Sequence, residues 1–123
     1  MIHTFAAIYI GSYEVSIKIF EISGKKKIRD IDYIRSRIEL GRDAYSKGSI
    51  GYELVEALCD TLAEYKKIMD GYRVDSYEAY AAAALRNAEN ELFILDQILS
   101  LIHICMLHFA GHDIVCTHDT DHV

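Results

Sequence analysis

The sequence predicts an α/β fold in which three strands, a helix, a fourth strand and a second helix follow one another. Three patterns lead to this prediction. A nearly continuous apolar run at residues 4–10 ends at Gly11, and short apolar runs that stop at a turn are typical of buried strands. Residues 15–22 alternate with a period of two, as a strand does. Residues 54–69 repeat apolar side chains at spacings of three, four and seven, which indicates an amphipathic helix.

The first three strands are expected to form an antiparallel sheet. The strand at residues 4–10 should be buried on both faces, and the tight turn at residues 11–14 connects it to the strand at residues 15–22. A basic tip at residues 24–27 reads GKKK, and we expect the third strand at residues 28–38. Short turns join all three strands, which favours antiparallel pairing.

The second half of the chain is expected to be mainly helical. Ser49 can cap the helix at residues 54–69 and Gly71 marks its end, because serine favours the N-cap and glycine the C-terminal stop. Alternation at residues 72–81 predicts the fourth strand. A second helix is expected over residues 87–98.

The charge is distributed unevenly along the 123 residues. All 13 Lys and Arg lie in residues 1–86 together with 13 acidic residues, whereas residues 87–123 hold six acidic residues and no Lys or Arg. The formal charge of −6 therefore comes from the last 37 residues. The chain has no basic stripe that would release counterions from a nucleic acid, so we expect no DNA partner.

The first ten residues, the apolar segment near the C-terminus and the cysteines indicate the cellular location. No Lys or Arg precedes the apolar residues of the first ten positions, so a secretory signal is not expected. The apolar segment at residues 94–110 is interrupted by polar side chains and is too short for a bilayer span, so no membrane partner is expected. Cys59, Cys105 and Cys116 form no paired framework, which favours a reducing cytoplasm.

The glycine turn between the first two strands has two interpretations. A Gly-Ser pair there is most often an ordinary turn. Glycine also allows the backbone to approach an anion closely, and successive N–H groups with a hydroxyl can surround a phosphate. Gly11 and Ser12 are therefore candidate phosphate-binding residues.

Four stretches of the sequence follow one another in a recognisable order. At residues 5–22 an apolar run leads through Gly-Ser into a second, alternating run. Residues 37–41 read RIELG, residues 48–53 read GSIGYE and residues 81–90 read AAAALRNAEN. In this order they resemble the opening strands, the Arg…Leu-Gly segment, a helix start and the Ala-rich Leu-Arg segment of the exopolyphosphatase / guanosine pentaphosphate phosphohydrolase (Ppx/GppA) family. The resemblance covers residues 5–98.

This resemblance implies the first subdomain of the actin-like ATPase (ribonuclease H-like) fold, here truncated. It also implies hydrolysis of terminal phosphate from inorganic polyphosphate, or of the 5′-phosphate of guanosine pentaphosphate, with Mg²⁺. The residues that would contact phosphate are Gly11, Ser12, Tyr13, Glu14 and Arg86, and Asn90 would support the helix end. The subdomain normally packs on another, so an exposed apolar surface is expected to make homo-oligomers.

The sequence departs from the family pattern at the turn and in length. Tyr9 stands at the position of the first-loop Asp, and a neutral phenol does not supply the charge that Mg²⁺ prefers in its oxygen ligands. Tyr13 and Glu14 replace an Asn-Ser pair. The second phosphate loop and the acidic residue that activates water lie beyond the matched region, so no catalytic residue is assigned and the chain alone is expected to be inactive. A non-catalytic phosphate- or nucleotide-binding module is the alternative.

Residues 99–123 do not resemble the family and form a tail rich in His, Cys and Asp. The residues that could bind a transition metal there are His103, Cys105, His108, His112, Cys116, His118, Asp119, Asp121 and His122. His108 and His112 have a helical ligand spacing, which makes a metal-binding tail an alternative function. The hexapeptide at residues 99–104 is also encoded by one frame of a sequencing-library transposon end, CTGTCTCTTATACACATC, so the tail is either a divergent native end or a cloning or assembly artefact. Residues 111–123 are expected to be poorly ordered, because they lack apolar periodicity.

Overall fold

The computed structural model describes residues 2–81, 83–86, 88–102, 106–109 and 112–115. The elements, in chain order, are β1 (His3–Ile10), β2 (Glu14–Ile22), β3 (Ile28–Arg37), α1 (Leu40–Lys47), α2 (Tyr52–Tyr72), β4 (Ser76–Ala81), α3 (Ala83–Arg86), α4 (Glu91–Ile102), β5 (Met106–Phe109) and β6 (His112–Val115). The predicted order of strands and helices is confirmed for the longer elements of residues 1–98. The short helices α1 and α3 and the β5–β6 pair are additions to it.

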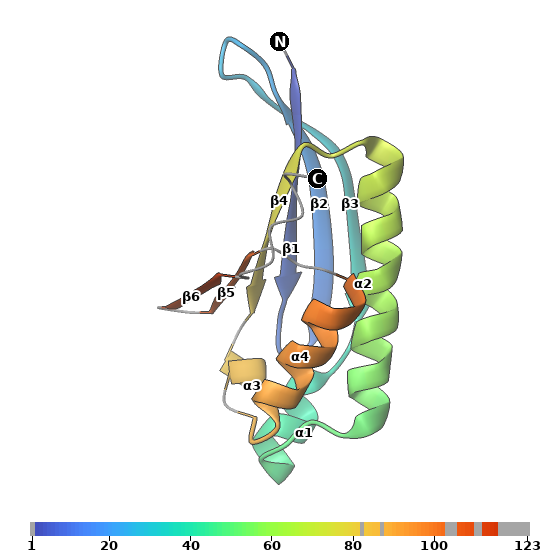
Figure 1. Cartoon of the computed structure of the whole chain (residues 1–123), viewed down its shortest axis with the longest axis vertical. Helices are drawn as coiled ribbons and strands as arrows, with labels where there is room; N and C mark the ends of the chain where they lie inside the picture. The colour runs from blue at the N-terminus through green and yellow to red at the C-terminus, as the bar shows by residue number, and fades with distance from the viewer. Residues whose placement is uncertain (1, 82, 87, 103–105, 110–111, 116–123) are drawn as a thin grey trace.

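The strands form one mixed sheet in the order β3-β2-β1-β4-β5-β6 (Figure 1). The predicted antiparallel pairing of β1 with β2 and of β2 with β3 is confirmed. β4 pairs with β1 in parallel, with Ile10 opposite Ala81. Because parallel strands end at the same edge of a sheet, the segments that follow β1 and β4 meet at one edge.

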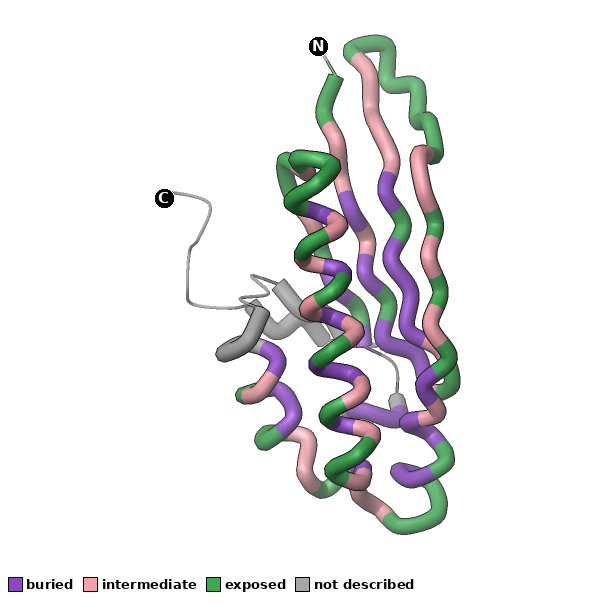
Figure 2. Tube along the Cα trace, turned by 90° about the vertical axis from the view of Figure 1, so that its right-hand side faces the viewer, coloured by how far each residue is buried: buried purple, intermediate pink, exposed green. Residues whose placement is uncertain are grey.

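Helices α2 and α4 lie on the same side of the sheet in both views (Figures 1 and 2). The face beneath them is apolar: Ile8 lies opposite Ile17, and both are fully buried. Helix α2 buries one stripe on this layer, at the spacing expected of an amphipathic helix. Its buried residues are Val55, Leu58, Cys59, Leu62, Tyr65 and Met69.

The expectation that β1 is buried on both faces is wrong. Ala6, Ile8 and Ile10 are buried, but Tyr9 is 48% exposed on the other face. No described helix covers that second face (Figure 2). Continuous apolar runs arise in strands that helices cover on both sides, and the described part of this chain supplies helices for one side only.

Helix α2 does not begin at the predicted cap. Gly48, with a φ of 78°, ends α1 in the left-handed conformation, so Ser49 lies in the loop that follows. Gly51 is the N-cap, and its N–H donates to Asp43 Oδ2 at 2.9 Å. The predicted serine cap is therefore wrong: Gly51 makes no side-chain cap hydrogen bond to α2, and the Asp43 carboxylate holds the N-cap residue itself.

Gly71 does not end α2 either, because the helix continues to Tyr72. Arg73 takes the left-handed conformation (φ 55°), and its N–H donates to the Asp70 carbonyl at 3.2 Å. Val74 then packs against the core. The strand β4 accordingly begins at Ser76, four residues later than predicted.

The helix expected over residues 87–98 is observed as α4, which begins at Glu91, four residues later than predicted, and continues to Ile102; the short helix α3 precedes it. In the tail, β5 pairs in parallel with β4 and antiparallel with β6. Within the segment expected to be poorly ordered, residues 112–115 form the strand β6, and residues 111 and 116–123 lie outside the described part of the chain. None of the described helices is long and apolar enough to cross a membrane.

Candidate phosphate-binding turn

The turn between β1 and β2 is tight, and it requires glycine at its first position. The Gly11 N–H donates to the Glu14 carbonyl at 2.8 Å and closes the turn. A Cβ atom on residue 11 would lie 2.7 Å from Cε2 of Tyr9 and 2.8 Å from the Glu14 carbonyl oxygen. Glycine is needed here for close approach rather than for an unusual backbone angle.

Helix α1 holds the turn in place. The Gly41 N–H donates to the Ser12 carbonyl at 2.6 Å, and the Ser12 hydroxyl shares a hydrogen bond of 3.2 Å with the Tyr45 phenol. Sequence reasoning missed both α1 and Tyr45, because this helix has eight residues and a weak apolar pattern. The signal that could have found it is the Leu-Gly pair at residues 40–41, already part of the family resemblance.

The turn offers backbone donors to an anion. In the described part of the chain, the amides of Ser12 and Tyr13 donate to no protein acceptor. Two successive N–H groups of this kind can bind phosphate oxygens. Glu14 contributes its carbonyl to the turn, and its carboxylate pairs with Arg35 at 3.4 Å, so the acidic group is engaged by a cation.

The sheet topology brings the other predicted residues to the same edge. Helix α3, which carries Arg86, follows β4 where the turn follows β1 (Figure 1). Asn90 clamps the loop before α2: its amide donates to the Ile50 carbonyl at 2.8 Å and accepts from the Ile50 N–H at 3.0 Å. The Glu89 N–H also donates to the Gly48 carbonyl at 2.7 Å. Asn90 therefore supports the loop between α1 and α2.

The residues at the turn do not fit a magnesium ion. Tyr9 holds its ring against Gly11, and the carboxylate that comes nearest in sequence, on Glu14, is paired with Arg35. Mg²⁺ selects carboxylate and phosphate oxygens, and a neutral phenol is a poor substitute. Among the described residues, no three His, Cys, Asp or Glu side chains gather to hold a metal.

The predicted metal ligands of the tail are separated by the fold. His108 lies on β5 and His112 on β6, so the helical ligand spacing inferred from the sequence is wrong. The physical reason is strand pairing, which sets Phe109 opposite His112 across a short connection. The other candidates (His103, Cys105, Cys116, His118, Asp119, Asp121 and His122) lie outside the described residues.

No protein-family model and no curated protein matches the sequence. Solved structures do match. The Ppx/GppA family member of Aquifex aeolicus superimposes with a TM-score of 0.84 at 27% identity, over 89% of this chain and 35% of that one. The match is to the N-terminal region of these proteins. The chain is thus similar in structure to the N-terminal region of Ppx/GppA proteins. It spans about a third of the length of these relatives.

The same architecture extends to more distant structures. The exopolyphosphatase of Cytophaga hutchinsonii superimposes with a TM-score of 0.80 at 22% identity, over 89% of this chain and 35% of that one. Thermus thermophilus RuvC gives a TM-score of 0.51 at 11% identity, over 87% and 63%. At these identities the likeness concerns fold alone, and it assigns the chain to the first subdomain of the actin-like ATPase (ribonuclease H-like) fold.

Proposed function

We propose that the chain supplies the first phosphate-binding loop of a phosphohydrolase. The reaction is release of the terminal phosphate of inorganic polyphosphate, or of the 5′-phosphate of guanosine pentaphosphate. The observation that carries the proposal is the turn at residues 11–14, which presents two amide donors at the end of the central strand β1 and is fixed on α1. Likeness to the Ppx/GppA structures supports it.

The 123-residue chain by itself is proposed to be inactive. Hydrolysis needs a group that activates water and a second clamp on the phosphate, and family resemblance places both beyond the matched region. Magnesium is proposed for the whole enzyme only, because the turn described above lacks the carboxylate to hold it. Cytoplasmic location, inferred from cysteine usage, stays a prediction.

A second candidate function is a non-catalytic phosphate- or nucleotide-binding module. Tyr9 favours it, because the phenol occupies the place of the family carboxylate and its ring packs on Gly11. In this case the turn would still bind phosphate, but no metal would be positioned beside it.

Assays of phosphate release test the proposed inactivity of the chain and, in a full-length context, distinguish the two candidate functions. We expect the purified chain to release no phosphate from polyphosphate above a metal-free blank, and release above that blank would overturn the proposal of inactivity. In a full-length context, Tyr9→Asp should raise hydrolysis if only the carboxylate is missing. Tyr33→Asp is the matched control, since Tyr33 is also an exposed tyrosine of the sheet, on β3. Equal rates for Tyr9→Asp and the parent would support the non-catalytic module.

The boundary at residue 98 is a separate proposal. Residues 1–98 are taken as the Ppx/GppA part, and residues 99–123 as a tail of different origin. Reading the genomic locus past codon 98 tests this, because an uninterrupted native frame through Val123 would rule out an artefact.

A further inference from the structure

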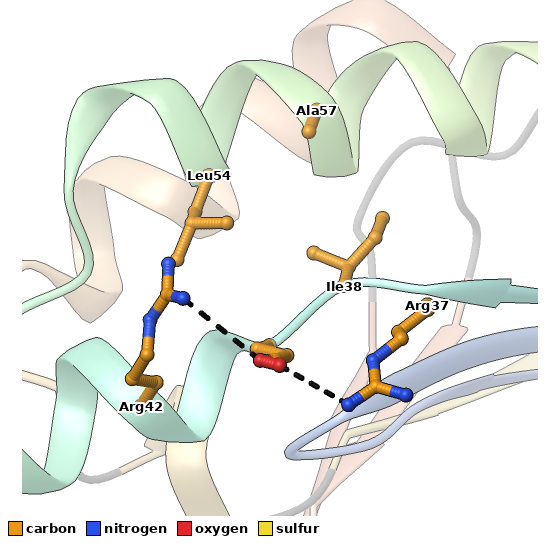
Figure 3. Close-up of a pocket in the computed structure, with 6 residues that line it drawn as sticks. Arg37, Ile38, Arg42, Leu54 and Ala57 are labelled. Carbon is orange, nitrogen blue, oxygen red and sulfur yellow. Dashed lines mark hydrogen bonds and ion pairs between the residues drawn. The ribbon is translucent and has the colours of Figure 1, made fainter.

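Arg37 lies between two hollows at the end of β3. One hollow, of about 460 Å³, is lined by Tyr13, Glu14, Arg35 and Arg37. The other, of about 330 Å³, is lined by Arg37, Ile38, Glu39, Arg42, Leu54 and Ala57. Figure 3 shows the second hollow beneath α2, with Arg37 on one side and Arg42 on the other. Because Arg37 lines both hollows, the three arginines line two neighbouring hollows, one beside the turn and the other beside α1.

The three guanidinium groups outnumber the carboxylates that pair with them. Glu39 lies between Arg37 Nη2 at 3.4 Å and Arg42 Nη1 at 3.9 Å (Figure 3). Arg35 Nε contacts Glu14 at 3.4 Å. Three cations against two anions leave one net positive charge. The arginine side chains are 60–85% exposed, and surface ion pairs of this kind are weak enough to exchange for a stronger anion.

The arginine track, defined as Arg35, Arg37 and Arg42, begins next to the proposed phosphate loop at residues 11–14. Tyr13 and Glu14, which line the first hollow, belong to the turn at residues 11–14. The hollow that Arg35 and Arg37 line is therefore next to the turn whose Ser12 and Tyr13 amides would hold a phosphate. Guanidinium groups bind phosphate oxygens through two parallel hydrogen bonds, which suits them to successive phosphates of a chain.

We propose that Arg35, Arg37 and Arg42 form a second anion subsite, which binds the phosphates of a linear polyphosphate beyond the one held at the turn. The inference rests on the proposed function and names the longer of its two substrates. A linear phosphate chain can satisfy all three arginine side chains in turn. A nucleotide would place a base there, and the lining residues include one aromatic side chain, Tyr13, against three guanidiniums.

The test measures binding of fluorescently labelled long-chain inorganic polyphosphate to the 123-residue chain, with pyrophosphate as a short competitor. Arg37→Ala and Arg42→Ala should each weaken long-chain binding about tenfold and flatten its salt dependence. Pyrophosphate extends only one phosphate beyond the turn, so Arg42→Ala should leave its binding unchanged and Arg37→Ala should weaken it less than it weakens long-chain binding. Arg29→Ala is the matched control: Arg29 lies at the far end of β3, is 77% exposed and pairs with Glu21 at 3.2 Å.

Two further variants exclude a merely structural role for the track. Arg37→Lys keeps the charge but loses the planar fork, so binding should be intermediate between Arg37→Ala and the parent. Glu39→Gln should strengthen long-chain binding, because the carboxylate no longer competes for Arg37 and Arg42. If these ion pairs served stability alone, Glu39→Gln would lower the melting temperature and leave binding unchanged.

Failures of the two proposals are distinguishable. Equal losses in Arg29→Ala, Arg37→Ala and Arg42→Ala, or no loss in any of them, would overturn the arginine subsite. Pyrophosphate binding would then still support the loop at residues 11–14. Conversely, arginine-dependent binding of the long chain without any pyrophosphate binding would overturn the phosphate loop and leave the arginine subsite standing.

Discussion

Tyr65 connects the helix layer to the sheet through a buried phenol. The residue is 2% exposed, and its hydroxyl donates to the Val15 carbonyl of β2 at 2.9 Å. The same oxygen shares a hydrogen bond of 3.0 Å with Ser36 on β3. Burial raises the pKa of the phenol, and the nearby Glu14 charge adds to this effect. The neutral form is therefore favoured in the folded state.

Removing this hydroxyl should destabilise the chain. Tyr65→Phe is expected to lower the free energy of unfolding by about 1–2 kcal/mol at pH 7, because buried hydrogen bonds are lost. A phenol whose pKa is raised on folding ionises first in the unfolded state, so the parent should lose stability as the pH rises above about 10. Tyr65→Phe has no phenol to ionise at this position. The difference in free energy of unfolding between the parent and the variant should therefore narrow at pH 11. Urea denaturation at both pH values checks this, and a gap that stays constant would contradict it.

At the scale of elements, the loop between α1 and α2 is held by groups from outside it. Asn90 satisfies both backbone groups of Ile50, which is 2% exposed. Asp43, itself buried, accepts from the Gly51 N–H. Unpaired backbone groups at a buried residue are costly, so these two side chains fix the start of α2. Through α1, the same framework holds the candidate phosphate-binding turn.

Removal of the Asn90 clamp should loosen this framework. Asn90→Ala is expected to lower the free energy of unfolding by about 1–3 kcal/mol, because the Ile50 N–H and carbonyl lose their partners. Asn90→Asp keeps the acceptor and loses the donor, so it should fall between Asn90→Ala and the parent. Urea denaturation at pH 7 measures both. An Asn90→Ala variant as stable as the parent would show that water replaces the clamp without cost.

At the scale of the whole molecule, the sheet leaves one face without a described helix. Phe5 and Phe20 stack on it with ring centroids 5.9 Å apart, opposite one another in the β1–β2 register. Tyr9 and Tyr33 add exposed aromatic area, at 48% and 55%. Apolar area of this kind on a sheet face favours association.

We propose that copies of the chain associate through this face. Sedimentation velocity should show a concentration-dependent shift towards dimer for the 123-residue chain. Phe20→Lys should abolish the shift, because a charge would be buried between copies. Lys67→Ala, on an exposed surface of α2, serves as the control and should leave it unchanged. A purely monomeric parent at high concentration would contradict the proposal.

Much of the fold was predictable because its signals are local. The period of two in β2 and the spacing of Leu58, Leu62 and Tyr65 in α2 each follow from one face packing on the core. The Gly11 turn was predictable as well, since glycine is needed there for a close backbone approach. Element ends were predicted less well, because the N-cap residue Gly51 is held by the Asp43 carboxylate of another helix and Arg73 takes a conformation that glycine usually takes.

The sequence by itself determined the order of the main elements, the antiparallel start of the sheet and the position of the glycine turn. These features depend on hydrophobic periodicity and on turn-forming residues, and both signals come from residues that are close together in the sequence. Only the tertiary structure decided that α1 supports the turn through Gly41, that Asn90 holds Ile50, and that Arg35 and Arg37 share a hollow with Tyr13 and Glu14 of the turn. Each of these depends on contacts between segments distant in sequence, and the strand register and helix packing that create such contacts exist only in the folded chain.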